Sequence, residues 1–368
     1  MAANAEHPAD ALCRILLELL KIPSVTGNEA QIADSFERWA LSRVPRLELQ
    51  RFGNNLVLGD LTDARPCVAL VGHLDTVPPH PSDPAPHREG DRVLGRGATD
   101  MKSGISVARL LFESLPLDRL PYALLFVLYD REEGPFAESG LKILLEEVKA
   151  LSAIDLAVIL EPTDNVIEVG CLGSLHAKVV VRGKAAHSAR PWQGASAIDK
   201  ALPLLTRVAA RAPVPVNVGG LTFKESMCFT LASAGQARNV VPDRFELNLN
   251  YRFAPADDPE VACKNAVATV RDVVGDAEIE VVDLAPPGSV PKDNPILTAL
   301  ALQVGGLRRP KEAWTDVARF GLWGIDAVNF GPGTPAQAHQ AAEWVSVSQM
   351  VACYETLQRF LGTPPPEL

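Results

Sequence analysis

Histidine and acidic residues follow the ends of several short apolar runs in this sequence, and together these residue types could bind metal ions. The first such segment, VALVGHLDTVPP, ends its apolar run in His73 and places Asp75 two residues later. Imidazole and carboxylate groups are ligands that suit zinc, with cobalt and manganese as alternatives. The residues of this kind that we single out are His73, Asp75, Asp100, Glu132, Glu133, Glu161 and His339.

Such a set of ligands could build a dinuclear hydrolytic centre, in which a carboxylate bridges two metal ions about 3.5–4 Å apart. The His-x-Asp spacing places Asp75 where it can accept the second imidazole N–H of His73 and fix its tautomer. In the pair of adjacent glutamates, one can bind metal while its neighbour remains free as a general base. Each residue taken alone also has a simpler interpretation, as a turn residue, a helix cap or a solvated helix start.

The apolar runs indicate the elements that must position these side chains. Residues 68–71, 122–129, 156–160 and 327–330 form continuous apolar runs, which are typical of strands buried on both faces in a mostly parallel α/β sheet. Apolar residues with helical spacing occur between them, for example over residues 105–115. Ligands bind outside the carboxyl ends of the strands in such a sheet. Because the acids and histidines share this placement, one common site is favoured over several unrelated turns.

The middle of the chain follows a different pattern. Between residues 174 and 285 the predicted order is strand, helix, strand, strand, helix, strand, which is a ferredoxin-like arrangement. Apolar and polar residues alternate over residues 245–253, so one face of this sheet is expected to contact water. The sequence therefore predicts an α/β catalytic domain of residues 1–173 and 286–368. An α+β lid or dimerisation domain of residues 174–285 interrupts it.

Composition and charge argue against several classes of protein. The chain has 368 residues and a formal net charge of −10, whereas a nucleic-acid partner requires a basic surface. We find no secretory signal, and no apolar segment approaches the roughly 20 residues that span a bilayer. Six widely spaced cysteines without a C-x-x-C pair favour reduced thiols. We therefore expect a cytoplasmic protein that has no membrane or nucleic-acid partner.

Five segments, in order along the chain, resemble the signatures of the dinuclear-zinc aminoacylase and carboxypeptidase family. They are GHLDTVP, GRGATDMKSG, REEG, LEPTD and GPGTPAQAH. The resemblance implies two zinc ions that share Asp100 as a bridging ligand. One ion would also be bound by His73 and Glu161, and the other by Glu133 and His339.

The resemblance also implies catalytic residues and an oligomeric state. Glu132 would take a proton from the attacking water and return it to the departing amine. His187, in the segment GKAAHSARP, would reach the active site of a neighbouring subunit and help to bind the oxyanion of the tetrahedral intermediate. The alternative for His187 is an ordinary surface loop. Many members of the family form dimers through the inserted domain, so a homodimer is expected.

Two further segments, ARNVVPDRFELNLNYRF and WTDVARFG, resemble one branch of the family in its actinobacterial form. That branch hydrolyses N-succinyl-LL-2,6-diaminopimelate to succinate and LL-2,6-diaminopimelate, a step in lysine biosynthesis. The match implies six substrate-binding residues, which are Asn239, Arg252, Thr315, Arg319, Ser174 and Gly333. Among these, the arginines suit substrate carboxylates.

One departure from this branch concerns Cys171 and Leu172, where several members carry two arginines. The set of residues that binds the substrate carboxylates therefore stays open. Within the family, the alternatives are an acetylornithine-type deacylase or a dipeptidase. Outside it, the alternative is a metal-binding scaffold without catalysis, which the presence of a general base at Glu132 disfavours.

Overall fold

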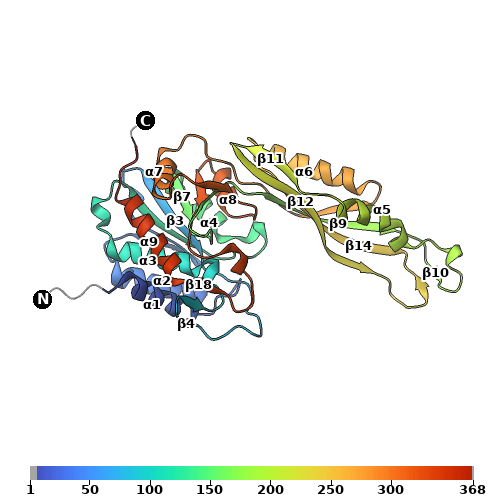
Figure 1. The fold of residues 1–368 in the computed structure, drawn as a ribbon, viewed down its shortest axis with the longest axis horizontal. Helices are drawn as coiled ribbons and strands as arrows, with labels where there is room; N and C mark the ends of the chain where they lie inside the picture. The colour runs from blue at the N-terminus through green and yellow to red at the C-terminus, as the bar shows by residue number, and fades with distance from the viewer. Residues whose placement is uncertain (1–5, 367–368) are drawn as a thin grey trace. The chain divides into compact units, whose positions relative to one another are not determined.

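The structure is a computed structural model that describes residues 6–366, and it divides into two compact units (Figure 1). Unit 1 contains the described residues of Met1–Val169, Pro291–Arg309 and Arg319–Leu368. Unit 2 contains Gly170–Val290 and Pro310–Ala318. The second of these segments was not indicated by the sequence pattern. None of the helices in the described residues is long and apolar enough to cross a membrane.

Within the described residues, unit 1 contains an eight-stranded mixed sheet with the order β1-β2-β6-β3-β7-β17-β8-β16. Its central strands β6, β3, β7 and β17 pair in parallel, and every residue in them is buried. This burial on both faces confirms the prediction drawn from the continuous apolar runs. The strands of the sheet are β1 (Leu49–Phe52), β2 (Asn55–Leu58), β3 (Cys67–His73), β6 (Ala123–Tyr129), β7 (Leu156–Ile159), β8 (Ile167–Val169), β16 (Arg308–Pro310) and β17 (Ala327–Asn329).

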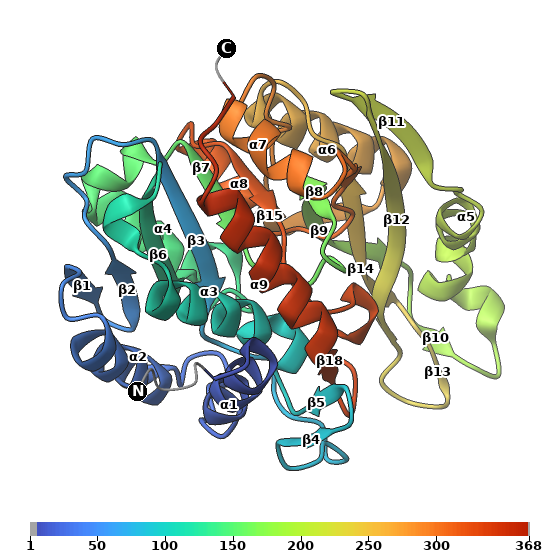
Figure 2. The ribbon, with the colours of Figure 1, turned by 60° about the vertical axis from the view of Figure 1, so that its left-hand side comes forward.

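Helices cover this sheet (Figure 2), and aromatic side chains form part of the contact. Phe126 of β6 stacks on Phe112, and Phe36 meets the same ring edge-on. These contacts place α2 and α3 on one face of the sheet. The helices of the unit are α1 (Pro8–Leu20), α2 (Ala30–Arg43), α3 (Ser103–Ser114), α4 (Gly140–Glu147), α7 (Pro295–Gln303), α8 (Val317–Leu322) and α9 (Val347–Leu361).

A small antiparallel sheet of three strands lies next to the start of α9 (Figure 2). Its central strand β5 pairs with β4 on one side and with β18 on the other. This pairing joins the segment just before Asp100 to the segment that follows His339. The strands are β4 (His87–Glu89), β5 (Arg92–Leu94) and β18 (Trp344–Ser346).

Unit 2 contains a five-stranded antiparallel sheet with the order β11-β12-β14-β9-β15 among its described residues. Two helices cover one face, where Leu175, Leu249 and Val270 belong to the hydrophobic core. Four of the strands and both helices have the ferredoxin-like order, which confirms the predicted fold class. The elements are β9 (Gly173–Arg182), α5 (Ala197–Ala209), β11 (Val214–Val218), β12 (Leu221–Ala234), β14 (Arg244–Phe253), α6 (Pro259–Val274) and β15 (Glu278–Ala285), with the short pair β10 (Ala186–His187) and β13 (Val240–Val241).

The six cysteines of the chain are free thiols in the structure. Four of them, Cys13, Cys67, Cys171 and Cys353, are buried. Burial raises the pKa of the Cys67 thiol to about 12, because the low-dielectric surroundings disfavour the thiolate. Buried thiols of this kind act as small apolar side chains.

Candidate metal centre

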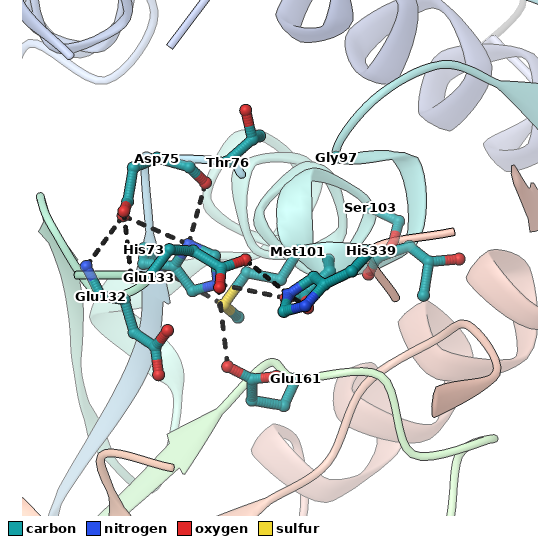
Figure 3. A network of polar contacts seen from close by, with 12 residues as sticks. His73, Asp75, Thr76, Gly97, Met101, Ser103, Glu132, Glu133, Glu161 and His339 are labelled. Carbon is teal, nitrogen blue, oxygen red and sulfur yellow. Dashed lines mark hydrogen bonds and ion pairs between the residues drawn. The ribbon is translucent and has the colours of Figure 1, made fainter. Parts of the chain in front are cut away.

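The carboxyl ends of the parallel strands bring the histidines and acids of the sequence motifs to one edge of the sheet in unit 1. His73 is the last residue of β3 and lies beside Tyr129, the last residue of β6. Ile159 of β7 in turn lies beside Asn329 of β17. The loops that leave these strands carry the remaining groups of the cluster, apart from Asp100, which lies in the segment that leads into α3. The residues that meet here are His73, Asp100, Glu133, Glu161 and His339 (Figure 3).

Asp100 lies between the two imidazoles and presents a different oxygen to each. Its Oδ1 is 3.2 Å from Nε2 of His73, and its Oδ2 is 3.3 Å from Nε2 of His339. One further carboxylate lies near each imidazole. Oε1 of Glu161 is 3.8 Å from the first imidazole, and Oε1 of Glu133 is 2.9 Å from the second. The arrangement therefore consists of two adjacent groups of ligands that share one carboxylate.

This donor set fits a pair of divalent cations. A tetrahedral zinc ion with ligands at about 2.0–2.2 Å places neighbouring ligand atoms about 3.3–3.6 Å apart. The four separations within the cluster, from 2.9 to 3.8 Å, lie around that range. Ligand atoms of His73, Asp100 and Glu133 also lie within 4.8 Å of one another. Mixed nitrogen and oxygen ligands suit zinc, cobalt or manganese.

Electrostatics at the cluster favour positive charge at both imidazoles. Burial lowers the pKa of His73, but hydrogen bonds to Asp100 and Asp75 and the charge of Glu132 outweigh it and raise the pKa well above its ordinary value. Hydrogen bonds to Asp100 and Glu133 raise the pKa of His339 to about 10. Burial would raise the pKa of Asp100, yet its two imidazole partners hold it below the usual range. A field of this kind attracts metal cations as it attracts protons.

Asp75 is fully buried and fixes the loop that carries the two adjacent glutamates. Its Oδ1 accepts the main-chain N–H of Glu132 at 3.0 Å, and its Oδ2 accepts that of Glu133 at 3.1 Å. Oδ2 also accepts the hydroxyl of Thr26 at 3.0 Å. The shortest contact of His73 Nδ1 is the main-chain carbonyl of Asp75 at 3.0 Å, whereas the carboxylate is 3.5 Å away. The role of this carboxylate in orienting the imidazole stays a prediction, and the structure adds a contact that positions the main chain of Glu132 and Glu133.

The side chain of Glu132 extends from this anchored loop toward the side of the cluster on which Glu161 lies (Figure 3). The side chain of Glu132 is half-buried, whereas Oε1 of the adjacent Glu133 lies 2.9 Å from Nε2 of His339. The assignment of one glutamate as a ligand and the other as a base stays a prediction.

Two of the predicted substrate-binding residues belong to unit 1. Gly333 has a φ of +98°, and a Cβ there would lie 3.1 Å from Thr99, next to Asp100, so a side chain would crowd this part of the site. Arg319 is buried, with 1% of its surface exposed. Its Nη2 donates to the main-chain carbonyl of Phe136 at 2.7 Å, and its guanidinium lies 4.2 Å above the Phe136 ring. These contacts give Arg319 a structural role that the motif did not indicate.

The other predicted residues belong to unit 2. His187 is exposed on β10, where its Nδ1 accepts the main-chain N–H of Ala189 at 3.1 Å. Arg252 lies on the polar face of β14, and its Nε donates to Oδ1 of Asn250 at 3.2 Å. Their roles in catalysis and substrate binding stay predictions, as do those of the three remaining residues. These are Ser174 on β9, Thr315, which is buried, and Asn239, which is exposed.

Two residues close to the cluster were missed by sequence reasoning. Thr26 contacts Asp75, and Glu343 binds the main chain around Asp100. Neither lies in a motif with a recognisable spacing. Thr26 is 49 residues from Asp75 in the chain, and Glu343 binds mainly main-chain groups, which leave no mark in the sequence. The alternation of polar residues in β14 could have indicated Asn250 as a neighbour of Arg252.

A mixed sheet with four parallel central strands carries two histidines and three acids at the carboxyl edge of those strands, and a ferredoxin-like unit interrupts the chain that forms it. This combination defines a hydrolase of the two-metal class. The chain belongs to peptidase family M20/M25/M40, whose sequence profile matches residues 69–363.

Individual relatives and one solved structure agree with this assignment. The chain is 37% identical over 350 residues to the succinyl-diaminopimelate desuccinylase of Corynebacterium glutamicum, and the alignment covers 94% of each chain. It is also 39% identical over 347 residues to a Mycobacterium tuberculosis H37Rv protein that is provisionally named as the same enzyme. That alignment covers 94% of this chain and 96% of the other. A tripeptidase from Staphylococcus aureus has the same fold, with a TM-score of 0.78 at 20% identity over 96% of this chain and 98% of that chain.

Proposed function

We propose that the protein hydrolyses the amide bond of N-succinyl-LL-2,6-diaminopimelate to give succinate and LL-2,6-diaminopimelate. The observation that carries the reaction type is the position of Asp100, with one oxygen facing His73 and the other facing His339. The identity to the actinobacterial desuccinylase over nearly the whole length of both chains supports the choice of substrate. The reaction would serve lysine biosynthesis in the cytoplasm.

Two zinc ions, with cobalt or manganese as substitutes, are the cofactors that we assign to the cluster. His73 and Glu161 would hold one ion, Glu133 and His339 the other, and Asp100 would hold both. When bound, such ions lower the pKa of a coordinated water from about 15.7 toward about 7 and polarise the amide carbonyl.

Glu132 is the residue to which we assign proton transfer. Its carboxylate takes a proton from the attacking water and returns it to the amine nitrogen that leaves, a contribution of about 10²–10⁴-fold to the rate. Asp75 keeps this carboxylate in place through the main-chain N–H of Glu132. His187 of the partner subunit would donate a hydrogen bond to the oxyanion that forms on the carbonyl oxygen.

Arg252 is the residue of unit 2 to which we assign a carboxylate of the substrate. Burial lowers the pKa of its guanidinium, because a partly buried cation loses hydration. Its Nε already donates to Asn250, an uncharged group. A substrate carboxylate would therefore bind the remaining N–H groups and restore charge balance. We assign further polar contacts with the substrate to Ser174, Asn239, Thr315 and Gly333.

A homodimer formed through unit 2 is the assembly that we propose. The described residues of this unit expose several large apolar side chains, including Trp192 at 76% and Leu231 at 71% of their surface. A partner subunit that covers such side chains would remove their apolar surface from water. Sedimentation of the purified protein at micromolar concentration tests this assembly, and a monomer would contradict it.

The decisive experiment measures metal content and hydrolysis on one preparation. We expect two metal ions per chain and a clear preference for N-succinyl-LL-2,6-diaminopimelate over N-acetylornithine and simple dipeptides. Glu132→Gln should keep both ions and lose about 10²–10⁴-fold in kcat, whereas the exposed Glu138→Gln should behave as wild type. Preference for N-acetylornithine would overturn the substrate assignment. Full metal content without hydrolysis of any amide would indicate a binding scaffold.

A further inference from the structure

The carboxylate of Glu343 binds the main chain of the segment that carries Asp100. Its Oε1 accepts the main-chain N–H groups of Thr99 at 2.8 Å and of Asp100 at 2.9 Å. Its Oε2 accepts the N–H of Gly97 at 3.0 Å and Nη1 of Arg96 at 3.1 Å. The side chain is buried, with 1% of its surface exposed. Four donors therefore converge on a single buried carboxylate.

The main chain at residues 97–100 has the form of an anion-binding nest, in which several N–H groups point into one concavity. Gly97 makes this form attainable, because its φ of +83° lies in the left-handed region that favours glycine. A Cβ at this position would also lie 2.7 Å from Cγ2 of Thr76. The nest is thus built into the backbone, and Glu343 supplies the anion that fills it.

Glu343 also connects the two segments that supply the central ligands. It follows His339 by four residues, and its main-chain carbonyl accepts the N–H of Gly95 at 2.9 Å. The hydroxyl of Thr99 donates to the carbonyl of Trp344 at 2.6 Å, so the contact continues into β18 (Figure 2). The segment before α3 and the segment after His339 are therefore held together around this carboxylate.

The main chain and the side chain of Asp100 have separate partners. Its main-chain N–H is bound by Glu343, while its side-chain oxygens face His73 and His339. Rotation of this peptide would move both oxygens away from their positions between the imidazoles. The main-chain hydrogen bond therefore restrains the direction in which the shared carboxylate points.

We propose that Glu343 is a positioning residue of the metal centre, which fixes the backbone at Asp100 so that one carboxylate can serve two cations. This inference rests on the proposed dinuclear centre. Glutamine at position 343 would replace one acceptor oxygen by an NH₂ donor. In either orientation of the amide, that donor would face N–H groups that now have an acceptor. The restraint on Asp100 would weaken, and with it the binding of at least one cation.

The test compares metal binding by the metal-free full-length proteins. Wild type, Glu343→Gln and Asp83→Asn are stripped with a chelator and titrated with Co²⁺ and Zn²⁺ by calorimetry, and the visible spectrum of the Co²⁺ forms is recorded. Asp83 is the matched control, because it contacts Arg96 and the N–H of Ala342 but not residues 97–100. The melting temperature of each metal-free protein reports its folding.

We expect Glu343→Gln to bind at least one cation 10- to 100-fold more weakly and to change the Co²⁺ spectrum, since partners of metal ligands commonly contribute this much. Asp83→Asn should retain wild-type affinities and spectrum. Wild-type behaviour of Glu343→Gln, or equal losses in both variants, would overturn the proposal. If Glu343→Gln does not fold, the same titration is carried out with Glu343→Asp. Its shorter side chain draws the carboxylate back from the N–H groups of residues 97–100, so the proposal requires that it also binds at least one cation more weakly. Failure of wild type to bind two cations would overturn the dinuclear centre itself.

Discussion

The replacement of Asp75 by asparagine tests whether the anchored loop is required for catalysis. The native carboxylate accepts hydrogen bonds from the N–H groups of both Glu132 and Glu133 through different oxygens. Asparagine keeps only one oxygen, so its NH₂ group must face one of these donors. A partly buried main-chain N–H is then left without an acceptor, next to the proposed base Glu132 and the proposed metal ligand Glu133.

The magnitude follows from the two contacts. A hydrogen bond to a charged group contributes about 1.5–3 kcal/mol, and a buried donor without a partner costs about 1–3 kcal/mol. We therefore expect Asp75→Asn to destabilise the native loop by about 2–4 kcal/mol. A displacement of a catalytic group by about 1 Å reduces the rate about 10²-fold. We expect kcat to fall about 100-fold, with a much smaller change in KM because the substrate-binding residues are elsewhere.

Steady-state kinetics, metal content and melting temperature of the same preparations provide the assay. The matched control is Thr26→Val, which removes the hydroxyl bond to Asp75 but leaves both main-chain bonds intact. Although a hydrogen bond to a charged group contributes about 1.5–3 kcal/mol, this variant should lose less than about tenfold in kcat, because the hydroxyl contacts neither Glu132 nor Glu133 and both main-chain bonds to Asp75 remain. If Asp75→Asn keeps its metals and turns over within threefold of wild type, the proposed role of this carboxylate is refuted.

Two further predictions concern residues next to the cluster. Lys102 donates from a buried Nζ to two main-chain carbonyls, and burial lowers its pKa from 10.5 to about 8. Between these pH values the unfolded chain binds more protons than the native protein, so the stability contributed by this lysine rises with pH, by up to about 3 kcal/mol. The melting temperature of wild type minus that of Lys102→Met should therefore increase from pH 7 to pH 10.5. A difference that does not change with pH would contradict this prediction. A Cβ at Gly104 would lie 2.2 Å from the carbonyl oxygen of Leu160, the residue before Glu161. Gly104→Ala should lower stability by about 1–3 kcal/mol, measured by urea unfolding, whereas Gly362→Ala, with its nearest atom at 3.3 Å, should change it little.

The sequence was informative where side chains carry the pattern. Strands such as β3 and β6 are buried on both faces, so their apolar runs were continuous and their carboxyl ends could be located. Four residues of the candidate cluster, His73, Glu133, Glu161 and His339, lie at or after those ends, and Asp100 lies in the segment that leads into α3. Residues that are distant in sequence could therefore be expected to meet at one edge of the sheet. In unit 2 the alternation along β14 likewise separated a core face from a polar face.

The sequence was uninformative where the main chain carries the contact or where a strand is exposed. The edge strand β11 has valine at every second position, but it contains Pro215, which argues against a strand, and its residues are exposed or only partly buried. The second role of Asp75 and the position of Glu343 depend on main-chain N–H groups, which every residue except proline possesses. The sequence therefore does not distinguish a buried glutamate that binds main-chain N–H groups from a glutamate on the surface.

The strand order of unit 1 has a consequence for the ribosomal synthesis of the protein. β17 lies between β7 and β8, although more than 150 residues, including most of unit 2, separate it from them in the chain. Until β17 has left the ribosome, one side of β7 has no partner, and such open strand edges promote association with other chains. His339 is also translated after the other four residues of the cluster. Nascent chains that stop before it should therefore be aggregation-prone, and the cation that we assign to Glu133 and His339 would be acquired only near the end of translation or afterwards.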